Sequence, residues 1–595
     1  MKKILKEPLL YLLPLLALIY IIIIPGIDIS DVKLTRGSTI ENIKLPYLIE
    51  MPRDEVFLIS FHISAKKKSA KFNMVPDDCI QEIHINGKNF PLNDIKGLCD
   101  IQNGAYIDFS RHIQEGLNNI EVYINNKGGG HGGLRIETPH NGLKALSLSH
   151  YIFALLFLFC FSLILIKLKF RFIAISIILL GIAARLILYT YTGPMQYSHD
   201  MHGNLSYIQI MAEEKRVPNS NECFVCYQPP LYYALSSVTK GILDSFKPES
   251  SIKNLADLYN PNLTKVLQQM SLLFSFGSLV LGIALLINLF GNKQGTYLAS
   301  LILALWPGFV LTAPRINNDI LFYFGALFCM FFAQRYWRWH KDSDVLLASI
   351  GTAIAIAAKS TGFVILAVWI VIYIFKVIHS VKAGSLKILL ASILIIALFA
   401  GLSNHRTIVN IFEGKKIEIV GNVGGLPSSL QVQNTASNYL YFDLRDYMLE
   451  PYVSPWADKG GRQYFWNYAI KTSLFGEFHL WNSPTGRVFA TAISILGLFI
   501  FMLALWGIIH VKFKDLPSFL FIIFLFAALI YLRVSYPYSS SNDFRYIMPV
   551  LFPLVYFSVR GVQILANPRL RMLSYTAMLS FAGLSFMLIV GMGLS

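Results

Sequence analysis

Residues 172–189 read FIAISIILLGIAARLILY, and the polar stretch YSHDMH follows at residues 197–202. An apolar run of about 18 residues is long enough to cross the hydrocarbon core of a bilayer, which is about 30 Å thick. The carboxylate of Asp200 therefore lies just beyond the exit of a predicted membrane span. A charged side chain is costly to place near lipid, so it usually marks chemistry or transport. This stretch predicts a helical membrane protein with a functional carboxylate beside an early span.

The composition extends this prediction to the whole chain of 595 residues. Hydrophobic residues make up 54% of the chain and charged residues only 14%, whereas a soluble protein would carry roughly 25% charge. The net charge of +16 does not imply nucleic acid as a partner, because most of the excess falls in short loops on one side of the predicted membrane. We therefore predict a polytopic helical membrane protein whose surroundings are membrane lipids.

The first 148 residues have a different character. An apolar run at 9–24 follows a basic stub and lacks a clear small-residue cleavage site, which predicts an uncleaved signal anchor within residues 1–27. Residues 28–148 are polar and contain turn signals such as Asn86-Gly87-Lys88. We predict an exported β-sandwich domain, jelly-roll-like, because 83–88 and 116–122 resemble strands of jelly-roll carbohydrate-binding modules. Sugar binding and a role as spacer or assembly domain are both open. The strand-like runs lie at residues 56–63, 80–85, 105–109 and 120–124.

Residues 149–595 contain the other apolar runs, which with the anchor give about thirteen predicted spans. After the anchor, the predicted spans lie at residues 149–167, 172–190, 265–290, 295–313, 319–335, 344–358, 361–378, 386–402, 487–508, 517–533, 545–562 and 573–593. Alternation places the basic turns at 167–171, 335–341, 376–387, 512–514 and 569–571 on the cytoplasmic side. The β-domain and the long loops 191–264 and 403–486 are then exported.

Two cysteine pairs fall in predicted exported segments. Cys79 and Cys99 lie in the β-domain, and Cys223 and Cys226 lie in the loop after Asp200. Either pair could form a disulfide in an oxidising compartment. The C-x-x-C spacing of the second pair also fits a redox pair or half of a zinc site. A second Cys/His pair at suitable spacing does not accompany it, which disfavours zinc.

Several polar motifs are predicted to share the exported face, and they resemble those of the GT-C superfamily of membrane glycosyltransferases. The similarity is to the protein-mannosyltransferase and aminoarabinose-transferase type, and it covers about residues 150–595. That type has an acidic residue after an early span, a (His/Gln/Lys)-Pro-Pro-Leu-Tyr motif, an Asn-Asp pair, a Lys-Thr/Ser-Gly element and a late Arg-Tyr-x-x-Pro. In this chain they fall on Asp200, Gln228-Pro229-Pro230-Leu231-Tyr232, Asn318-Asp319, Lys359-Ser360-Thr361-Gly362 and Arg545-Tyr546-Ile547-Met548-Pro549.

The chain also departs from the family pattern. Protein mannosyltransferases carry an Asp-Glu pair where this chain has Asp200-Met201, and Gln228 stands where His or Lys is common. The resemblance therefore does not specify the donor sugar or a metal ligand.

The resemblance implies a GT-C transmembrane catalytic domain at residues 149–595 that acts as an inverting glycosyltransferase. Such an enzyme moves a monosaccharide from a polyprenyl-phosphate carrier to a glycan, lipid or protein acceptor. The reaction needs a base for the acceptor proton and cations for the phosphate, while a divalent metal can assist without being required. The implied roles are Asp200 as base with Asp319 as competitor, Arg545, Lys359 and Arg315 on the phosphate, His199, His202, Gln228, Tyr232, Asn318 and Tyr546 on the substrates, and Glu222 as a candidate metal ligand.

Ordinary structural roles are alternatives for several of these residues. Asp319 could cap a helix, Arg545 could snorkel to the interface, and Lys359 could be a span-end charge. Two other functions are also open: a glycan polymerase or ligase with a lipid-diphosphate donor, and a transporter. A transporter would more often show midspan charges and broken helices related by a repeat. The Lys/Ile-rich composition favours a bacterial inner membrane with a periplasmic site, ahead of the endoplasmic reticulum.

Overall fold

The chain is mostly helical, with a small β region near its N-terminus. The computed structural model describes residues 29–43, 47–65, 71–99, 104–127, 130–137, 170–193, 196–246, 261–291, 293–380, 386–412, 428–456, 460–481 and 484–594. The chain divides into two compact units. The first comprises Met1–Phe157, Thr190–Arg216 and Ser236–Gln268, and the second comprises Leu158–Tyr189, Val217–Leu235 and Gln269–Ser595.

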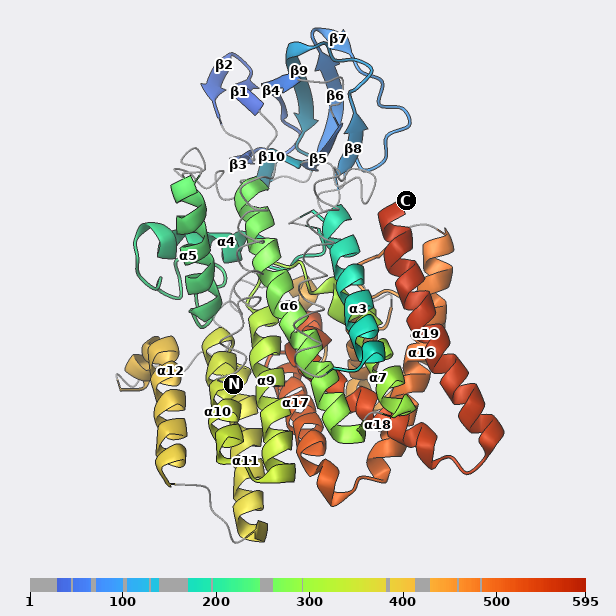
Figure 1. Ribbon diagram of the computed structural model, residues 1–595. Coiled ribbons are helices and arrows are strands. Elements are labelled where there is room, and N and C mark those ends of the chain that lie inside the picture. Colours follow the sequence, from blue (N-terminus) through green and yellow to red (C-terminus); the bar gives the residue numbers. More distant parts are fainter. Residues whose placement is uncertain are drawn as a thin grey trace. The chain divides into compact units, whose positions relative to one another are not determined.

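The strands of the first unit form two antiparallel sheets (Figure 1). The six-stranded sheet has the order β2-β1-β4-β9-β6-β7, and the four-stranded sheet has the order β3-β10-β5-β8. The strands are β1 Ile29–Arg36, β2 Thr39–Asn42, β3 Tyr47–Met51, β4 Val56–Ala65, β5 Lys71–Asp77, β6 Cys79–Ile85, β7 Lys88–Asn89, β8 Ala105–Asp108, β9 Gly116–Asn125 and β10 Gly130–Glu137. The predicted strand-like runs at 56–63, 80–85, 105–109 and 120–124 correspond to β4, β6, β8 and β9.

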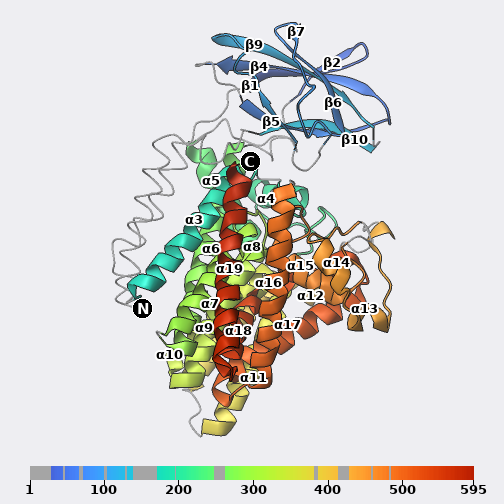
Figure 2. The same cartoon turned by 90° about the vertical axis from the view of Figure 1, so that its right-hand side faces the viewer.

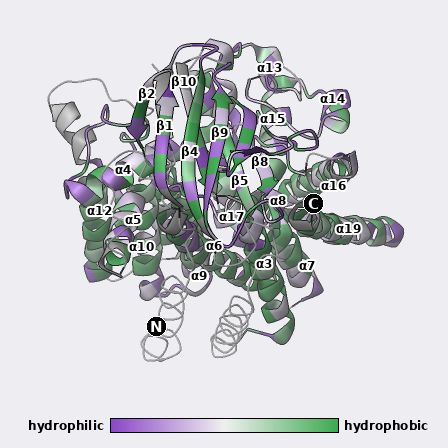
Figure 3. Ribbon diagram, turned by 90° about the horizontal axis from the view of Figure 1, so that it is seen from above, coloured by the Kyte–Doolittle hydropathy of each residue, from purple (hydrophilic) through white to green (hydrophobic). Residues whose placement is uncertain are grey.

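Alternation along the strands explains why the two sheets share a core. In β9, Ile120, Val122 and Ile124 are buried while Glu121 and Tyr123 are partly exposed, because successive side chains of a strand point to opposite faces. Figure 3 shows this change of hydropathy from residue to residue along β1, β4 and β9. Buried residues of both sheets belong to one apolar cluster. The β region is therefore a two-sheet sandwich.

A disulfide reinforces this domain. Cys79 at the start of β6 is bonded to Cys99, 20 residues further along the chain. Closing a loop of that size stabilises a fold by about 3 kcal/mol when the effect is attributed to the entropy of the unfolded chain. The prediction that this pair could form a disulfide agrees with the structure.

The second unit is built from helices, several of which can be followed in Figure 2. Three of them, α3, α5 and α6, also have residues in the first unit, which contains α4 Met201–Glu213 as well. The helices are α3 Phe172–Tyr191, α5 Leu231–Phe246, α6 Pro261–Phe290, α7 Gln294–Leu305, α8 Pro307–Leu311, α9 Asp319–Trp339, α10 Asp342–Ala358, α11 Gly362–Ser380, α12 Leu386–Phe412, α13 Ala436–Leu440, α14 Leu444–Leu449, α15 Phe465–Phe475, α16 Pro484–Ile509, α17 Leu516–Ser535, α18 Leu551–Ile564 and α19 Pro568–Leu594. Short 3₁₀ segments include η7 Ser539–Asn542 and η8 Phe544–Val550.

Nine helices within the described residues are long and apolar enough to cross a membrane. The chain is thus a multi-pass membrane protein, and these nine agree with nine of the predicted spans. The predicted spans 9–24 and 149–167 lie outside the described residues. The candidate spans are Phe172–Tyr191, Leu263–Phe290, Asp319–Trp339, Gly362–His379, Leu386–Asn404, Pro484–Ile509, Phe513–Ser535, Ser539–Ile564 and Pro568–Met592.

Two predicted spans correspond to shorter helices. The predicted span 344–358 is α10, which has 17 residues. The predicted span 295–313 is broken, because α7 has 12 residues and ends before Trp306, and Pro307 then begins α8. Proline lacks the N–H that would continue α7, but its fixed φ suits the first turn of a new helix. A single straight span in this segment was therefore the wrong expectation.

The helices of the second unit differ greatly in burial. Only 11% of the most apolar window of Leu386–Asn404 is buried, against 83% for Ser539–Ile564 and 72% for Asp319–Trp339. Apolar side chains on a helix that is open on most sides suit contact with lipid tails. The helices α9 and α18 therefore form the interior of this unit, and polar residues at their ends are shielded from lipid.

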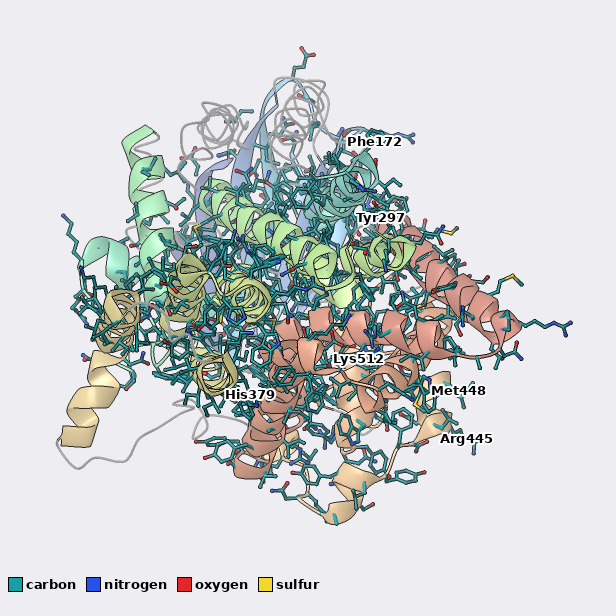
Figure 4. All side chains as sticks on the ribbon, turned by 60° about the horizontal axis from the view of Figure 1, so that its bottom comes forward. Phe172, Tyr297, His379, Arg445, Met448 and Lys512 are labelled. Carbon is teal, nitrogen blue, oxygen red and sulfur yellow. A yellow bond between two sulfur atoms is a disulfide. The ribbon has the colours of Figure 1, made fainter. Side chains whose placement is uncertain are left out.

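Three of the basic turns lie together. The ring of His379, at the end of α11, is 5.5 Å from the ring of Phe513, in the turn after α16. The indole N–H of Trp337, at the end of α9, donates to the carbonyl of Phe513 over 3.2 Å. Figure 4 labels His379 and Lys512 at this end of the helices. The turns around residues 335–341, 376–387 and 512–514 thus share one end of the unit, as alternation predicts; its cytoplasmic orientation stays a prediction.

Candidate functional site

Segments far apart in the sequence meet at one end of the buried helices α9 and α18. The hydroxyl of Tyr323 in α9 donates to the carbonyl of Arg545 in η8 over 2.7 Å. The backbone N–H of Phe544 donates to Thr472 Oγ1 in α15 over 3.0 Å. The side chain of Asn318, just before α9, donates to the carbonyl of Ala358 at the end of α10 over 2.8 Å. The polar residues carried by these segments form one cluster.

The position of α15 is fixed by close backbone contacts. A Cβ atom on Gly308 of α8 would lie 2.1 Å from the carbonyl oxygen of Ser473, so only glycine fits there. The indole N–H of Trp306 donates to the same carbonyl over 2.6 Å. On the other side, the buried ammonium of Lys471 donates to Asp446 Oδ2 over 3.1 Å. The short helices α8 and α15, visible in Figure 2, therefore hold the residues that follow α15 in a defined place.

The first charged pair of the cluster is Lys359 with Asp319. The Lys359 ammonium donates to Asp319 Oδ1, and both side chains are more than nine-tenths buried. The amide of Asn317 donates to Asp319 Oδ2 over 3.3 Å, and the Lys359 ammonium lies 4.6 Å from the ring centre of Tyr546. Burial lowers the pKa of Lys359, and the Asp319 carboxylate opposes that change. The N-cap of α9 is Asn318, so Asp319 is the first helical residue and its carboxylate serves the ion pair.

The second charged pair is Arg545 with Asp543. The Arg545 Nε lies 3.2 Å from Asp543 Oδ2, and the backbone N–H of Arg545 donates to Asp543 Oδ1 over 3.0 Å. The guanidinium also donates to the hydroxyl of Tyr546 over 3.1 Å. The Arg545 side chain is only 11% exposed and that of Asp543 only 1% exposed. Arg545 is therefore held inside the protein by a carboxylate and a phenol.

Arg315 is a third cation, and its surroundings differ from those of the other two. It is 3% exposed, and its guanidinium lies 4.8 Å from the ring centre of Phe478. Within the part of the chain that the structure describes, its Nε and Nη2 have no hydrogen-bond partner. Burial lowers the pKa of Arg315 to about 10, while the carboxylate of Asp543 acts in the opposite direction. Arg315 thus presents a desolvated positive charge with two open donors.

A third carboxylate, Glu477, follows α15, and sequence reasoning missed it. The hydroxyl of Tyr468 donates to Glu477, and the carboxylate oxygens of Glu477 and Asp543 approach within 4.8 Å. Burial raises the pKa of Glu477, although Arg545 and Arg315 oppose the shift. The only sequence signal is one acidic residue in the aromatic stretch LFGEFHLW at 474–481, which matches no quoted motif.

The amide residues predicted to bind substrate contact one another. Asn318 Nδ2 donates to Gln228 Oε1 over 3.2 Å, so the Pro-Pro motif and the Asn-Asp pair lie side by side. Cys223 and Cys226 form a disulfide that ends two residues before Gln228. Tyr232, the last residue of the same motif, is fully buried and hydrogen-bonded to Ser271 over 3.1 Å. Gln228 and Asn318 thus border the charged cluster, whereas Tyr232 belongs to helix packing.

Four predicted site residues remain: Asp200, His199, His202 and Glu222. Asp200, His199 and His202 belong to the first unit, where Asp200 is exposed and precedes α4 with a left-handed φ of 54°. The side chain of Asn204 donates to the carbonyl of His199 over 3.2 Å. Glu222 is exposed, and its carboxylate accepts hydrogen bonds from the backbone and side chain of Asn219.

No protein-family model matches this chain, and no curated protein matches it either. The likeness to GT-C enzymes therefore stands on the motifs quoted above.

Proposed function

We propose that the protein is an inverting glycosyltransferase of the GT-C type. It would transfer a monosaccharide from a polyprenyl-phosphate carrier to a glycan, lipid or protein acceptor on the periplasmic face of a bacterial inner membrane. This proposal includes about thirteen spans in all. The observation that carries it is the buried guanidinium of Arg315, which has two open donors beside the ion pairs of Lys359 and Arg545. Leaving such donors unfilled costs free energy, so an anion is the ligand that this cluster suits best.

The charge balance supports a donor with a single phosphate. Lys359 is neutralised by Asp319 and Arg545 by Asp543, which leaves Arg315 and Glu477. Because burial favours the neutral form of Glu477, the cluster has a surplus of one positive charge. A sugar joined to a lipid through one phosphate is a diester with one negative charge. A lipid diphosphate carries two and would leave the buried site with an excess of negative charge, which is unfavourable in a low-dielectric setting.

The decisive experiment compares donors. Purified protein in nanodiscs would be given polyprenyl-phosphate sugars and the matching polyprenyl-diphosphate sugars, and release of the lipid phosphate would be measured. We expect turnover with at least one single-phosphate donor and none with its diphosphate partner. Turnover of the diphosphate donor alone would replace this proposal with a polymerase or ligase. Absence of turnover with either class, in protein that binds neither, would reject a glycosyltransferase.

The base is assigned to Asp200. Asp319 is the competing carboxylate, but its charge is already engaged by Lys359, whereas Asp200 is exposed at the start of α4. We expect Asp200→Asn to bind donor normally and to lose about 100- to 10,000-fold in turnover, as removal of a general base typically does. Asp319→Asn removes the counter-ion of Lys359, so its effect should fall on donor binding rather than on proton transfer. Normal turnover in Asp200→Asn, with an inactive Asp319→Asn that still binds donor, would reverse the two roles.

One observation favours the transporter alternative. The helix break between α7 and α8 lies beside the buried Arg185, and broken helices with buried charges are common in transporters. The Arg185 guanidinium donates to the carbonyl of Ala304 over 3.0 Å and to Ser275 Oγ over 2.9 Å. It therefore fills bonds that the break leaves open, which suits a structural role better than a substrate site. Uptake of labelled lipid-linked sugar into proteoliposomes, without chemical conversion, would support transport.

A further inference from the structure

Two acidic side chains of the cluster, Glu477 and Asp543, lie close to one another. Glu477 follows α15, and Asp543 lies between η7 and η8, so the two come from separate segments. Their carboxylate oxygens are within 4.8 Å of one another. The Asp543 side chain is 1% exposed. Two buried carboxylates at this separation repel one another when both are ionised, so such a pair tends to hold a proton.

The groups around the pair indicate which carboxyl holds that proton. Asp543 is bound by the side chain and the backbone N–H of Arg545, and these contacts stabilise its anion. Glu477 accepts a hydrogen bond from the neutral phenol of Tyr468. Its pKa is raised by burial, against the fields of Arg545 and Arg315. Other charged or titratable groups that interact with Asp543 include Arg315, Lys359, Tyr323 and Tyr468. The proton is therefore placed on Glu477.

The transfer reaction creates a need for such a proton. The donor phosphate is a diester with one negative charge. When its bond to the sugar breaks, the electron pair stays on the phosphate oxygen, and the lipid phosphate becomes a dianion. A second negative charge in a buried site is costly, and Arg315 supplies only one surplus positive charge. A proton delivered to the departing oxygen would keep the charge of the cluster constant.

Resting on the glycosyltransferase function proposed above, we propose that Glu477 is the general acid that protonates the leaving lipid phosphate, with Asp543 holding Arg545 beside it. The acceptor oxygen bonds to the anomeric carbon and loses its proton to the base. The bond between that carbon and the phosphate oxygen breaks, and the oxygen takes the proton of Glu477. The Glu477 carboxylate then faces Arg545 and Arg315 until water reprotonates it. The base loses its proton to water, so protons balance over the cycle.

The test is a pH profile of turnover in Glu477→Gln, in nanodiscs with the polyprenyl-phosphate sugar that wild type uses. Turnover of wild type should fall at alkaline pH as Glu477 loses its proton. Glu477→Gln should lose about 100-fold or more in kcat, keep its donor KM within a few fold, and lack the alkaline decline. The matched control is Glu450→Gln, which alters an exposed carboxylate paired with exposed Arg487 and should behave as wild type. An alkaline decline that persists in Glu477→Gln overturns the proposal.

A second variant keeps the proposal testable if Glu477→Gln fails to fold. Tyr468→Phe leaves the carboxyl in place and removes the hydrogen bond that lowers its pKa, so the alkaline decline should move to higher pH. An unmoved decline would contradict the assignment. A divalent ion held by the pair is the competing role: loss of wild-type turnover with chelator, together with loss of bound metal in Glu477→Gln, would establish it and overturn the acid. If wild type turns over no lipid-phosphate sugar, the proposed function itself fails; if wild type is active and Glu477→Gln matches it, only the general acid fails.

Discussion

Two buried arginines of the helical unit differ in their hydrogen bonding: within the described residues, Arg185 has one buried nitrogen without a partner, Nη2, and Arg315 has two, Nε and Nη2. Arg185 in α3 is fully buried, and it donates to Ser275 Oγ and to the carbonyls of Gly181 and Ala304 over 2.9–3.0 Å. Arg315, between α8 and α9, is 3% exposed, and within the described residues its Nε and Nη2 have no partner. Each guanidinium also stacks on a phenylalanine ring, at 4.6 Å and 4.8 Å from the ring centre. The two sites therefore resemble each other in packing and differ in hydrogen bonding.

This difference separates a structural charge from a charge that suits a ligand. The carbonyl of Ala304 lies one residue before the end of α7, where the break at Pro307 removes the usual helical donors. Arg185 supplies a donor there, as backbone groups within a membrane require. Within the described residues, the Nε and Nη2 of Arg315 have no hydrogen-bond partner, and a buried donor left open costs about 1–3 kcal/mol, or more when charged. That cost would be offset if an anion bound beside Arg315, as the proposed function requires.

Among the changes that test this comparison, Arg315→Met should have the largest effect. We expect turnover to fall by about 100- to 1000-fold, because a desolvated donor to a developing anion is lost. The melting temperature should equal or exceed that of wild type, since replacing a buried charge with an apolar side chain of similar size is often neutral or stabilising. Turnover and thermal unfolding in the same nanodisc preparation would measure both. Arg487→Met, at an exposed arginine, is the control. A fall in melting temperature that matched the loss of turnover would make Arg315 structural, like Arg185.

The second-largest effect should come from Arg185→Met, which should lower the stability of the protein. The carbonyl of Ala304 would lose its donor, which costs about 1–3 kcal/mol. We expect a lower melting temperature and a lower yield of monodisperse protein, while the folded fraction binds donor normally. The melting temperature of Arg185→Lys should lie between those of wild type and Arg185→Met, because a single ammonium cannot reach all three acceptors in the geometry of a guanidinium. An unchanged melting temperature with lost turnover would show that Arg185 acts in function rather than in stability.

The smallest effect should be the pH dependence of stability that Glu477 contributes. Burial raises its pKa in the folded state, so the folded protein holds a proton that the unfolded chain has released. This stabilisation is fully present below the pKa of the unfolded chain and is lost as pH rises through the folded pKa. Glu477→Gln should therefore match wild type in melting temperature at pH 5 and exceed it at pH 8. The opposite order at pH 8 would show that the carboxylate form is the stabilising one.

The parts of this molecule that sequence could predict are those set by local pattern. Nine predicted spans correspond to apolar helices of the structure. A helix that crosses the hydrocarbon core must be long and apolar, and a short window of sequence shows both properties. Pro307 by itself indicates a helix break, but the apolar residues on both sides of it favoured the prediction of one span at 295–313. The pairing of Lys359 with Asp319 was not predicted, because no local pattern shows that two span ends 40 residues apart are in contact. Glu477 was not predicted for the same reason, because its role depends on Asp543 and Arg545, which come from another part of the chain.

The two disulfides provide a way to test whether the loops that carry them are exported, as predicted. Cys79–Cys99 and Cys223–Cys226 form in chains whose loops pass through an oxidising compartment, and such bonds are rare in a reducing cytosol. Cys329, by contrast, is a buried thiol between α9 and α10. Alkylating the native protein and then the reduced, unfolded protein would give peptide masses that report which loops were exported. The native cysteines of the wild-type chain can therefore report membrane topology in a single preparation, without any engineered cysteine.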